Sequence, residues 1–468
     1  MKISPIFFAV FLLLPLAVNA QSILGQKEFL VIVRSNHPVS KQAELLNRSF
    51  QAEKLIARGG FEPKLTADVD QKTFDGKNYF TAGDYALKVP SWYGLEFKAG
   101  YKTLTGLNLN PADELPVAGQ GILGIGASLI QNLLIDERRA TLKKAALLRD
   151  LNAAERRNIQ NELLYEAGKT YWEWVLNYNQ IRVFEESVRL AEVRFEGVRQ
   201  QFFLGDKTAF DTTEANVLVQ DRQVELSEAM LEYKNAGLRL SAFLWTDNGI
   251  PLEISDNTIP PKMEEFIAVT PADFNTEIDE NRSQIKVSHP AIVALEYKIR
   301  QLEIDRKLKR EKLKPQLDLS YNFLGNGLNL AGKDQVLLNN YSLGLHFNSP
   351  LVFRKARGEV ELANIKISDS RFKQQQKTLD LETKLLAFYN EYSTTVQQLN
   401  TYNKVAENYS VLLDGENERF KIGESSIFLL NSRERKVIEA RLKLNKLNIQ
   451  LEKLKLSIEF AKGTLAGQ

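Results

Sequence analysis

The residues that most enzymes use for chemistry are scarce in this chain of 468 residues, which has no cysteine and only three histidines. Without cysteine there can be no disulfide scaffold, thiolate zinc site, iron–sulfur cluster or cysteine nucleophile. The string Gly119-x-Gly121-x-x-Gly124 matches the dinucleotide-binding fingerprint. However, it follows Pro111 and Pro116 instead of a strand, and it leads into alternating residues instead of a helix. We therefore predict no cofactor there and interpret the glycines as relief of crowding inside a barrel of strands.

The histidines His37, His289 and His346 lie far apart in the sequence. His37 and His289 each precede a proline at matching helix starts, which favours a structural role. His346 lies on the polar face of a predicted strand, which favours a solvated side chain. Six other candidates lie close together: Tyr171, Trp172, Trp174, Tyr178, Glu185 and Glu186. We interpret the aromatic ones as helix packing and the acids as solvated helix surface. With neither a Ser/His/Asp nor a metal-binding constellation, we predict no enzyme, no metal and no cofactor.

The first twenty residues have the composition of a secretory signal peptide. Lys2 precedes an apolar run from Ile6 to Val18, and Ala20 ends a small-residue cleavage site. Because the run is shorter than a membrane-spanning helix requires, we predict that residues 1–20 are removed and that no transmembrane helix remains. Residue 21 is Gln, so we expect no acylated N-terminus, and any membrane attachment must come from the protein surface.

The rest of the chain is an internal duplication. Three pairs of segments match: His37-Pro38 with His289-Pro290, Pro63-Lys64-Leu65 with Pro315-Gln316-Leu317, and residues 202–206 with 420–424. The first two pairs are 252 residues apart and the third is 218 apart, so the first half has 34 extra residues between 75 and 120. We predict a first repeat at 21–245 (helix, strand, strand, long helix, returning helix), a Pro-rich connector in an equatorial region at 246–288, and a second repeat at 289–468.

Each half contains two stretches in which apolar and polar residues alternate. The four predicted strands cover 65–69, 123–129, 317–323 and 341–347, and their period of two gives each strand one apolar face. With flanking residues they are about ten residues long, which suits a tilted strand that crosses a bilayer. The extra segment 85–119 alternates like a further strand near Leu95 and Phe97. A chain whose helices all lie on one side of the membrane must cross it an even number of times. We therefore place the extra segment in an extended external loop.

Long helices follow the strands. Residues 135–203 and 354–421 contain no proline, so each could form a helix of roughly 100 Å. Each helix is expected to end at a glycine, Gly205 or Gly423, which is a C-cap signal. A second helix then returns to about Trp245 or Leu465.

The returning helices carry two seams with heptad spacing. In the second half the sets are Leu430, Val437, Leu444, Leu451 and Ile458; Ala440, Leu447, Leu454 and Ala461; and Leu442, Ile449 and Leu456. The third set lies nearly opposite the first, and the first half repeats the pattern. Two opposed seams predict a neighbour on each side of the helix, as in a wall of helices closed into a cylinder.

In this order and duplicate spacing, the sequence resembles the outer membrane efflux protein family, the TolC-like exit ducts. The similarity covers the His-Pro helix starts, the strand openings at Pro63 and Pro315, the strand exit at 349–351, and the turns 202–210 and 420–428. It implies a mainly α fold with a small β part. It also implies a homotrimer in which four strands per chain close a 12-stranded β-barrel in the outer membrane, continued by a 12-helix α-barrel through the periplasm.

The resemblance also implies a function and partners. A TolC-like duct would be the passive outer-membrane exit of a tripartite efflux or type I secretion system, extending into the periplasm. Its partners would be outer membrane lipid, a periplasmic adaptor (membrane fusion) protein and an inner-membrane pump. The adaptor contact would lie at the two periplasmic turns, at Gly205, Asp206, Gly423, Glu424 and Ser425.

The candidate gate residues follow from a departure from the family pattern. Many members carry acids shortly after the second glycine, where this chain has Leu429 and Ser432. The charged candidates that remain for closing the tunnel are Asp211, Arg433 and Arg435, and if closure is apolar the candidates are Phe210 and Phe428.

Two other classes of function stay open. A periplasmic coiled-coil adaptor or structural stalk would explain the helices but leaves the alternating segments without a purpose. A secreted hydrolase would need a nucleophile constellation that is not found. A net charge of +2 gives no reason to expect a nucleic-acid partner.

Overall fold

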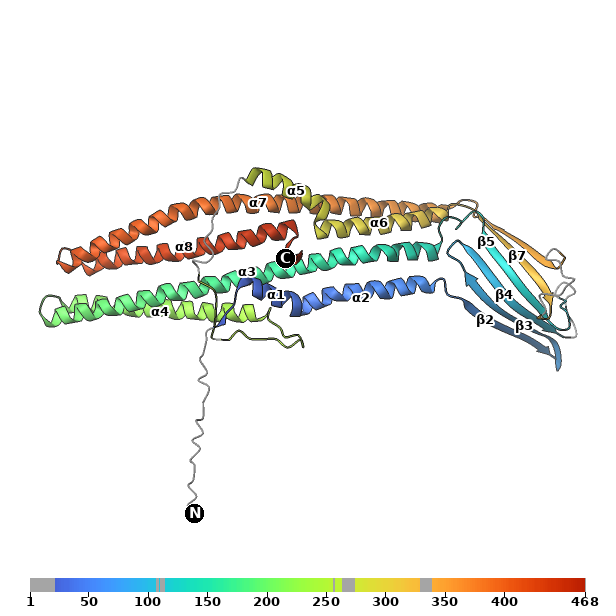
Figure 1. The fold of residues 1–468 in the computed structure, drawn as a ribbon, viewed down its shortest axis with the longest axis horizontal. Coiled ribbons are helices and arrows are strands. Elements are labelled where there is room, and N and C mark those ends of the chain that lie inside the picture. The colour runs from blue at the N-terminus through green and yellow to red at the C-terminus, as the bar shows by residue number, and fades with distance from the viewer. Residues whose placement is uncertain are drawn as a thin grey trace, which may run out of the picture. The chain divides into compact units, whose positions relative to one another are not determined.

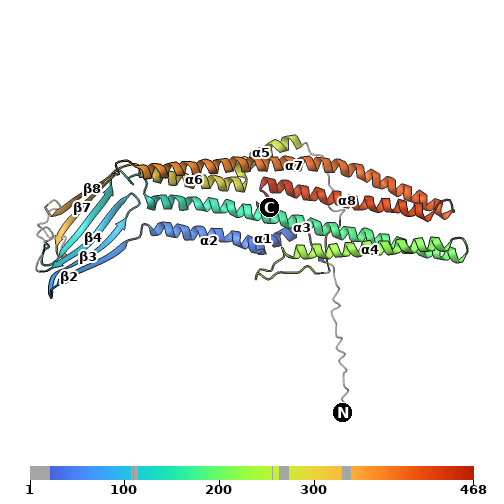
Figure 2. The ribbon, with the colours of Figure 1, turned by 180° about the vertical axis from the view of Figure 1, so that it is seen from behind.

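The structure, a computed structural model, describes residues 22–106, 109, 114–255, 257–262, 274–328 and 339–467, so the predicted signal peptide lies outside it. The elements (Figures 1 and 2) are β1 (Ser22–Ile23), α1 (Gln26–Asn36), α2 (Pro38–Gly59), β2 (Lys64–Phe74), β3 (Lys77–Pro90), β4 (Leu95–Thr105), β5 (Gln120–Ser128), α3 (Glu137–Phe203), α4 (Ala209–Ser241), β6 (Thr258–Ile259), α5 (Phe274–Ser288), α6 (Pro290–Glu311), β7 (Gln316–Asn326), β8 (Tyr341–Asn348), α7 (Arg354–Lys421) and α8 (Ile427–Lys462). The two long helices expected from the sequence are confirmed, with 67 residues in α3 and 68 in α7. Within the described ranges, no helix has both the length and the apolar composition needed to span a membrane.

The chain forms two compact units, and each unit takes segments from both halves of the sequence. Unit 1 comprises the residues up to 41 together with 160–277 and 385–460, and unit 2 comprises 42–159, 278–384 and 461–468. The long helices α3 and α7 each contribute to both units. The repeat boundaries at 21–245 and 289–468 stay a prediction.

Unit 2 contains an antiparallel sheet of six strands in the order β2-β3-β4-β5-β7-β8. Four strands were expected, and the extra segment was placed in an external loop. That placement is wrong: residues 77–90 and 95–105 form β3 and β4, which pair with each other and lie between β2 and β5. The chain therefore has six strands in this sheet instead of four.

Two tight turns create the additional hairpin. Asp75 and Gly76 have φ values of 53° and 73°, as a two-residue type I′ hairpin turn requires, and they join β2 to β3. At the other end of β3, the Ser91 N–H donates to the Leu95 carbonyl at 2.7 Å and Gly94 has a φ of 86°. Because the hairpin adds two crossings, the direction of β5 is unchanged and the even-crossing rule still holds.

The helices of unit 2 pack through small side chains. Ala140 of α3 is fully buried in a cluster with Ile135 and Leu308. A second cluster joins Leu151 and Ala154 to α6. The Asn152 amide nitrogen of α3 also donates to a backbone carbonyl of α2 at 2.7 Å. Short residues at these contacts let the helices approach closely and leave few voids.

In unit 1 an aromatic cluster anchors α1 to α3. Tyr171, Trp172 and Trp174 are at most 1% exposed. Phe29 of α1 stacks on Tyr171 with ring centroids 5.6 Å apart, and the Tyr171 hydroxyl donates to the Leu24 carbonyl at 2.8 Å. Burial, with a smaller contribution from Glu28, raises the pKa of Tyr171. The packing role predicted for these aromatic residues is confirmed.

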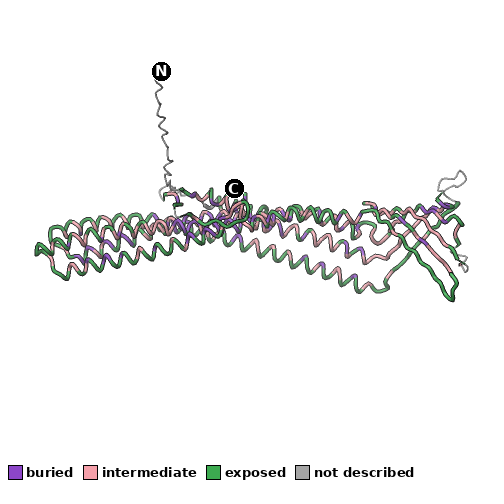
Figure 3. Tube along the Cα trace, turned by 90° about the horizontal axis from the view of Figure 1, so that it is seen from below, coloured by how far each residue is buried: buried purple, intermediate pink, exposed green. Residues whose placement is uncertain are grey.

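The two seams differ between the returning helices. In α8, residues of both seams are buried, including Leu451 of the first set and Ile449 of the third. In α4 the first seam is buried at Val219 and Leu240 and half-buried at Leu226 and Tyr233. The opposite seam is exposed on the chain surface at Val217, Val224, Leu231 and Leu238. Figure 3 shows this recurrence of buried residues along the helices, whereas the sheet is mostly intermediate or exposed. One neighbour of α4 is therefore missing from the single chain.

Candidate functional site

The sheet turns apolar side chains to one of its two faces. One row of directly paired residues on this face crosses all six strands: Leu65, Leu87, Ala99, Leu123, Phe323 and Tyr341. A second row crosses β3 to β8: Val89, Phe97, Ile125, Tyr321 and Leu343. Leu65 is 80% exposed in the chain and Leu343 is 62% exposed. So large an exposed apolar surface indicates contact with lipid or with another protein.

The opposite face of the sheet is polar. A row on this face contains Lys64, Lys88, Lys98, Gly124, Asn322 and Ser342. Four residues before Lys88 on β3, the Asp84 carboxylate forms an ion pair with Lys102 of β4 at 3.2 Å. His346 also lies on this face, opposite Asp318. The sheet therefore has one apolar and one polar face.

The sheet has two open edges. Among the described strands, β2 pairs only with β3 and β8 pairs only with β7. The free N–H and C=O groups of an edge strand are a template for another strand. Within a bilayer they would have to be paired, because no water is present to bind them.

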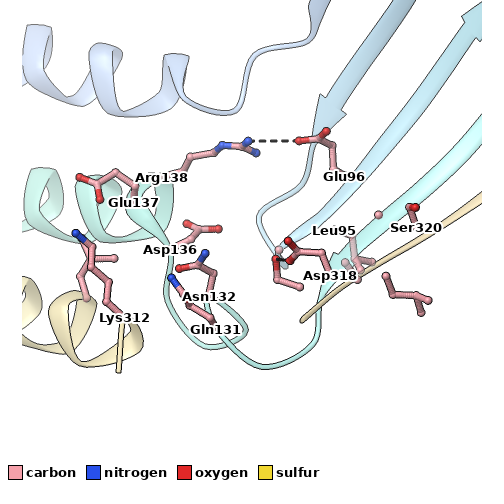
Figure 4. A pocket seen from close by; sticks show the side chains of 16 residues that line it. Leu95, Glu96, Gln131, Asn132, Asp136, Glu137, Arg138, Lys312, Asp318 and Ser320 are labelled. Carbon is pink, nitrogen blue, oxygen red and sulfur yellow. Dashed lines mark hydrogen bonds and ion pairs between the residues drawn. The ribbon is translucent and has the colours of Figure 1, made fainter. Parts of the chain in front are cut away.

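A cavity of about 590 Å³ lies where strand ends of the sheet meet α3 and α6 (Figure 4). Two of its acidic side chains are engaged within the chain: Glu96 forms an ion pair with Arg138 at 3.3 Å, and Asp318 accepts a hydrogen bond from Ser128 at 2.6 Å. No cluster of three or more potential metal ligands occurs among the residues that the structure describes. The cavity is a polar joint between sheet and helices.

The two helical turns of unit 1 have the same hydrogen-bond pattern. The Gly205 N–H donates to the carbonyl of Phe202 at 3.0 Å, and the Asp206 N–H donates to a carbonyl one residue earlier at 2.9 Å. The corresponding distances at Gly423 and Glu424 are 3.1 and 2.9 Å. Both glycines have positive φ, 86° and 82°, as the C′ position of a Schellman motif requires. The predicted C-cap role of these glycines is confirmed in both halves.

The crests of these turns are open. No atom lies within 4 Å of a Cβ built on Gly205 or Gly423, and the preceding residues Leu204 and Ile422 are 77% and 69% exposed. The turns lie at the same end of unit 1, and the Lys207 ammonium of one turn lies 4.8 Å from the ring centroid of Phe420 at the other. The predicted adaptor contact at these crests stays a prediction.

The turns differ at the helix that follows. Thr208 and Asp211 form a capping box: the Thr208 N–H donates to the Asp211 carboxylate at 2.9 Å, and the Asp211 N–H donates to the Thr208 hydroxyl at 3.2 Å. Hydrogen bonds to the carboxylate from the Thr208 N–H and from the Thr208 hydroxyl, the latter at 2.8 Å, hold the pKa of Asp211 below its usual value. In the second turn the Leu429 N–H donates to the Ser426 hydroxyl at 3.3 Å, and no carboxylate returns the bond. Asp211 therefore has a helix-capping role that the sequence analysis did not identify.

The other candidate gate residues either form contacts within the α7–α8 pair of helices or lie exposed on the surface. Arg433 of α8 lies 3.6 Å from the Glu416 carboxylate of α7. A hydrogen bond from the Ser425 hydroxyl, at 2.5 Å, holds the pKa of Glu416 below its usual value, and nearby arginines add to this effect. The remaining candidates are exposed: Arg435, Phe210 and Phe428. Pairing of the gate residues between subunits stays a prediction.

Unit 1 contains two helical hairpins, one formed by α3 and α4 and the other by α7 and α8. The contacts between them were not predicted from the sequence. Arg194 of α3 forms an ion pair with Glu434 of α8, and the same guanidinium nitrogen donates to the Asn431 side chain at 3.1 Å. The side chains of Arg194 and Glu434 are only 13% and 3% exposed. Nearby, an apolar cluster is formed by Val198, Ala215 and Ile427, with Phe195 and Phe420 packed against it. A charged residue one helical turn after the seam residue Leu430 was the only available sequence signal for this contact.

The histidines that precede prolines cap helices, as predicted. The His37 Nδ1 accepts a hydrogen bond from the Val39 N–H and the His289 Nδ1 accepts one from the Ala291 N–H, each at 3.2 Å. Burial, with a smaller contribution from Lys377, lowers the pKa of His289 to about 4. This structural role is confirmed for both residues.

The buried His289 predicts that the protein loses stability in acid. An unfolded histidine binds a proton below about pH 6.5, whereas folded His289 does so only near pH 4. We therefore expect the contribution of His289 to the free energy of unfolding to be full above pH 6.5. It should fall by about 3 kcal/mol as the pH is lowered to 4. The measurement is the thermal midpoint of purified protein in detergent across this range. His289→Asn, which keeps a capping acceptor but cannot titrate, should flatten the dependence, whereas His37→Asn at a half-buried cap should change it less. Parallel curves for the parent and His289→Asn would contradict this assignment.

Comparisons with known proteins support the resemblance. Residues 281–464 match the family model described as outer membrane efflux protein. The probable outer membrane lipoprotein SilC of Salmonella typhimurium is 21% identical over 270 residues, which cover 55% of this chain. The match spans about half of the length of that relative, 52%. The family resemblance stated from the sequence is thus confirmed.

Solved structures share the fold over nearly the whole chain. The CmeC outer membrane channel of Campylobacter jejuni is 13% identical, with a TM-score of 0.64, and the similarity covers 94% of this chain and 85% of that one. The open state of the MtrE outer membrane channel of Neisseria gonorrhoeae is 14% identical, with a TM-score of 0.65 and coverage of 94% and 88%. A membrane protein of Pseudomonas aeruginosa is 14% identical, with a TM-score of 0.65 and coverage of 93% of both chains. The predicted mainly helical fold with a small β part is confirmed.

Proposed function

We propose that this chain, which carries the pattern of the outer membrane efflux protein family at residues 281–464, is one subunit of a homotrimeric exit channel. The channel crosses the outer membrane and extends into the periplasm. Substrates enter it from an inner-membrane pump through a periplasmic adaptor and leave by passive diffusion. The relatives named as outer membrane channels support this assignment.

The observation that carries the proposal is a sheet with one apolar face, one polar face and two open edges. A curved sheet of this kind is a segment of a barrel, and strands from other copies would satisfy its edges. Three chains with six strands each would close an 18-stranded barrel, in place of the 12 strands expected from the sequence. The alternative of a periplasmic adaptor or stalk gives this sheet no role.

A second feature supports contact between copies in the helical part. The residues Val217, Val224, Leu231 and Leu238 of α4 form an exposed heptad stripe, hereafter the α4 stripe. Heptad spacing suits packing against another helix, and in α8 the equivalent seam is already covered within the chain. A second copy of this chain would cover the α4 stripe.

The test is the oligomeric state of purified protein. We expect the parent to require detergent, to have the mass of a trimer by light scattering, and to conduct ions in a planar bilayer. Leu231→Glu would bury an uncompensated carboxylate between copies, so it should yield folded monomers. Gln223→Glu adds the same charge on α4 outside the α4 stripe and should leave the trimer intact. A parent protein that is a soluble monomer without detergent would end the proposal.

A further inference from the structure

We propose that the β3–β4 hairpin gives the exit channel a band of lysines that attracts anionic solutes. The band is the row Lys64, Lys88 and Lys98, hereafter the lysine row, and the hairpin supplies two of its three members. This inference rests on the proposed function, because it needs the polar face of the sheet to line the channel.

The register of the strands brings the three lysines together. Lys64 of β2 is paired with Lys88 of β3, and Lys88 is paired with Lys98 of β4. Residues paired directly across antiparallel strands have Cβ atoms about 5 Å apart, and like charges in such positions destabilise a sheet. The row therefore lowers the stability of the sheet, and an anion bound beside it would offset the repulsion.

Two of the acids near the lysine row have other partners. Glu96, two residues before Lys98, forms an ion pair with Arg138, and Asp84 forms one with Lys102. In the part of the chain that the structure describes, no ion pair includes a lysine of the row. The row itself is thus positively charged, whereas the next charged row on the polar face, four residues along the strands, contains Asp68, Asp84 and Lys102.

The apolar side chains next to the row decide which way it faces. Leu65, Leu87 and Phe97 are the chain neighbours of the three lysines, and they point to the opposite face of the sheet, where they are exposed. Where the hairpin turns back near α2, the ring of Trp92 stacks on that of Phe61 at 4.6 Å, as suits an aromatic belt at a membrane surface. With the apolar face in lipid, the lysine row lies in the water of the channel.

Symmetry strengthens the effect. Three copies would place nine lysines in one band of the barrel wall. A wall lined with one sign of charge raises the local concentration of ions of opposite sign, with association rates increased on the order of tenfold or more. The expected solutes are anions such as those with carboxylate, phosphate or sulfonate groups.

The experiment uses single cysteines, which this chain allows because it has none of its own. Thr66 lies on the polar face beside the row, and Leu65 lies on the apolar face. Thr66→Cys in outer membranes is treated from outside with a sulfonate-bearing or an ammonium-bearing methanethiosulfonate of similar size. We expect the anionic reagent to react about tenfold faster than the cationic one. Adding Lys88→Gln and Lys98→Gln should bring the ratio close to one.

Controls separate this inference from the proposed function. Lys77→Gln removes an exposed lysine of the same hairpin outside the row, so it should leave the reagent ratio unchanged. Each single variant, Lys88→Gln or Lys98→Gln, should give an intermediate ratio if the double variant does not assemble. A ratio that stays high without the lysines would overturn the inference and leave the channel intact. Equal reactivity of Leu65→Cys and Thr66→Cys would instead contradict the membrane wall and with it the proposed function.

Discussion

Arg194→Ala is expected to raise the resting conductance of the channel. The buried ion pair of Arg194 with Glu434 joins α3 of one hairpin to α8 of the other. Removing one partner of a buried pair leaves an uncompensated charge and costs about 3–5 kcal/mol. Because each of three subunits would lose the contact, we expect hairpins that are held together at rest to separate more often. The measurements are single-channel conductance in planar bilayers and the sensitivity of cells to large antibiotics.

A matched control lies on the same helix. Arg189 forms an exposed ion pair with Glu186 within α3, at 2.6 Å, and a pair of this kind contributes about 0–1 kcal/mol. Arg189→Ala should therefore leave conductance unchanged. The exchange Arg194→Glu with Glu434→Arg restores opposite charges and should return conductance toward that of the parent. If Arg194→Ala conducts as the parent does, this pair does not hold the closed state.

The gate residues expected from the sequence provide a second comparison. Asp211 caps its own helix and Arg433 pairs within its own hairpin, so neither holds the two hairpins of one chain together. A double variant, Asp211→Asn with Arg433→Gln, would raise conductance only if these residues meet between subunits. A larger effect of this variant than of Arg194→Ala would place the closure at the subunit interface.

The helices and turns could be predicted because the sequence states them twice. Long segments without proline, the heptad spacing of leucines and the glycines at 205 and 423 each recur in both halves, and local chemistry decides a helix end. The Schellman bonds at Gly205 and Gly423 agree to within 0.1 Å in length. A C-cap glycine is needed wherever the backbone must adopt positive φ, so this signal does not depend on distant contacts.

The β3–β4 hairpin and the contacts between the two helical hairpins could not be predicted in the same way. In β3 and β4 the small residues Gly83, Ala86 and Gly100 weaken the alternation, and the segment has no copy in the second half. The Arg194 and Glu434 pair is not duplicated either, because the equivalent positions are Leu412 and Asn216. Such a contact depends on how two helices are placed against each other, and a single sequence does not specify that placement.

The double variant Gly205→Trp with Gly423→Trp is expected to abolish export while trimers still form. Both positions have positive φ, which costs a residue with a side chain about 1–2 kcal/mol. No atom lies within 4 Å of a Cβ placed at either position, so the first side-chain atom meets open space. Their bulk would be felt only by a partner that docks on the crests. Export is measured as drug resistance of cells that depend on this channel, and assembly as trimer recovered from membranes.

A variant that keeps the backbone but not the open surface separates these effects. Asn tolerates positive φ better than other residues with a side chain and is much smaller than Trp, so Gly205→Asn with Gly423→Asn should retain most of the export. Loss of export with Trp and not with Asn would locate a partner at the crests, beside the exposed side chains of Leu204 and Ile422. Equal loss in both variants would instead indicate a damaged turn. Normal resistance in the Trp variant would remove the adaptor contact from these turns, while the trimer and its conductance would still test the channel by itself.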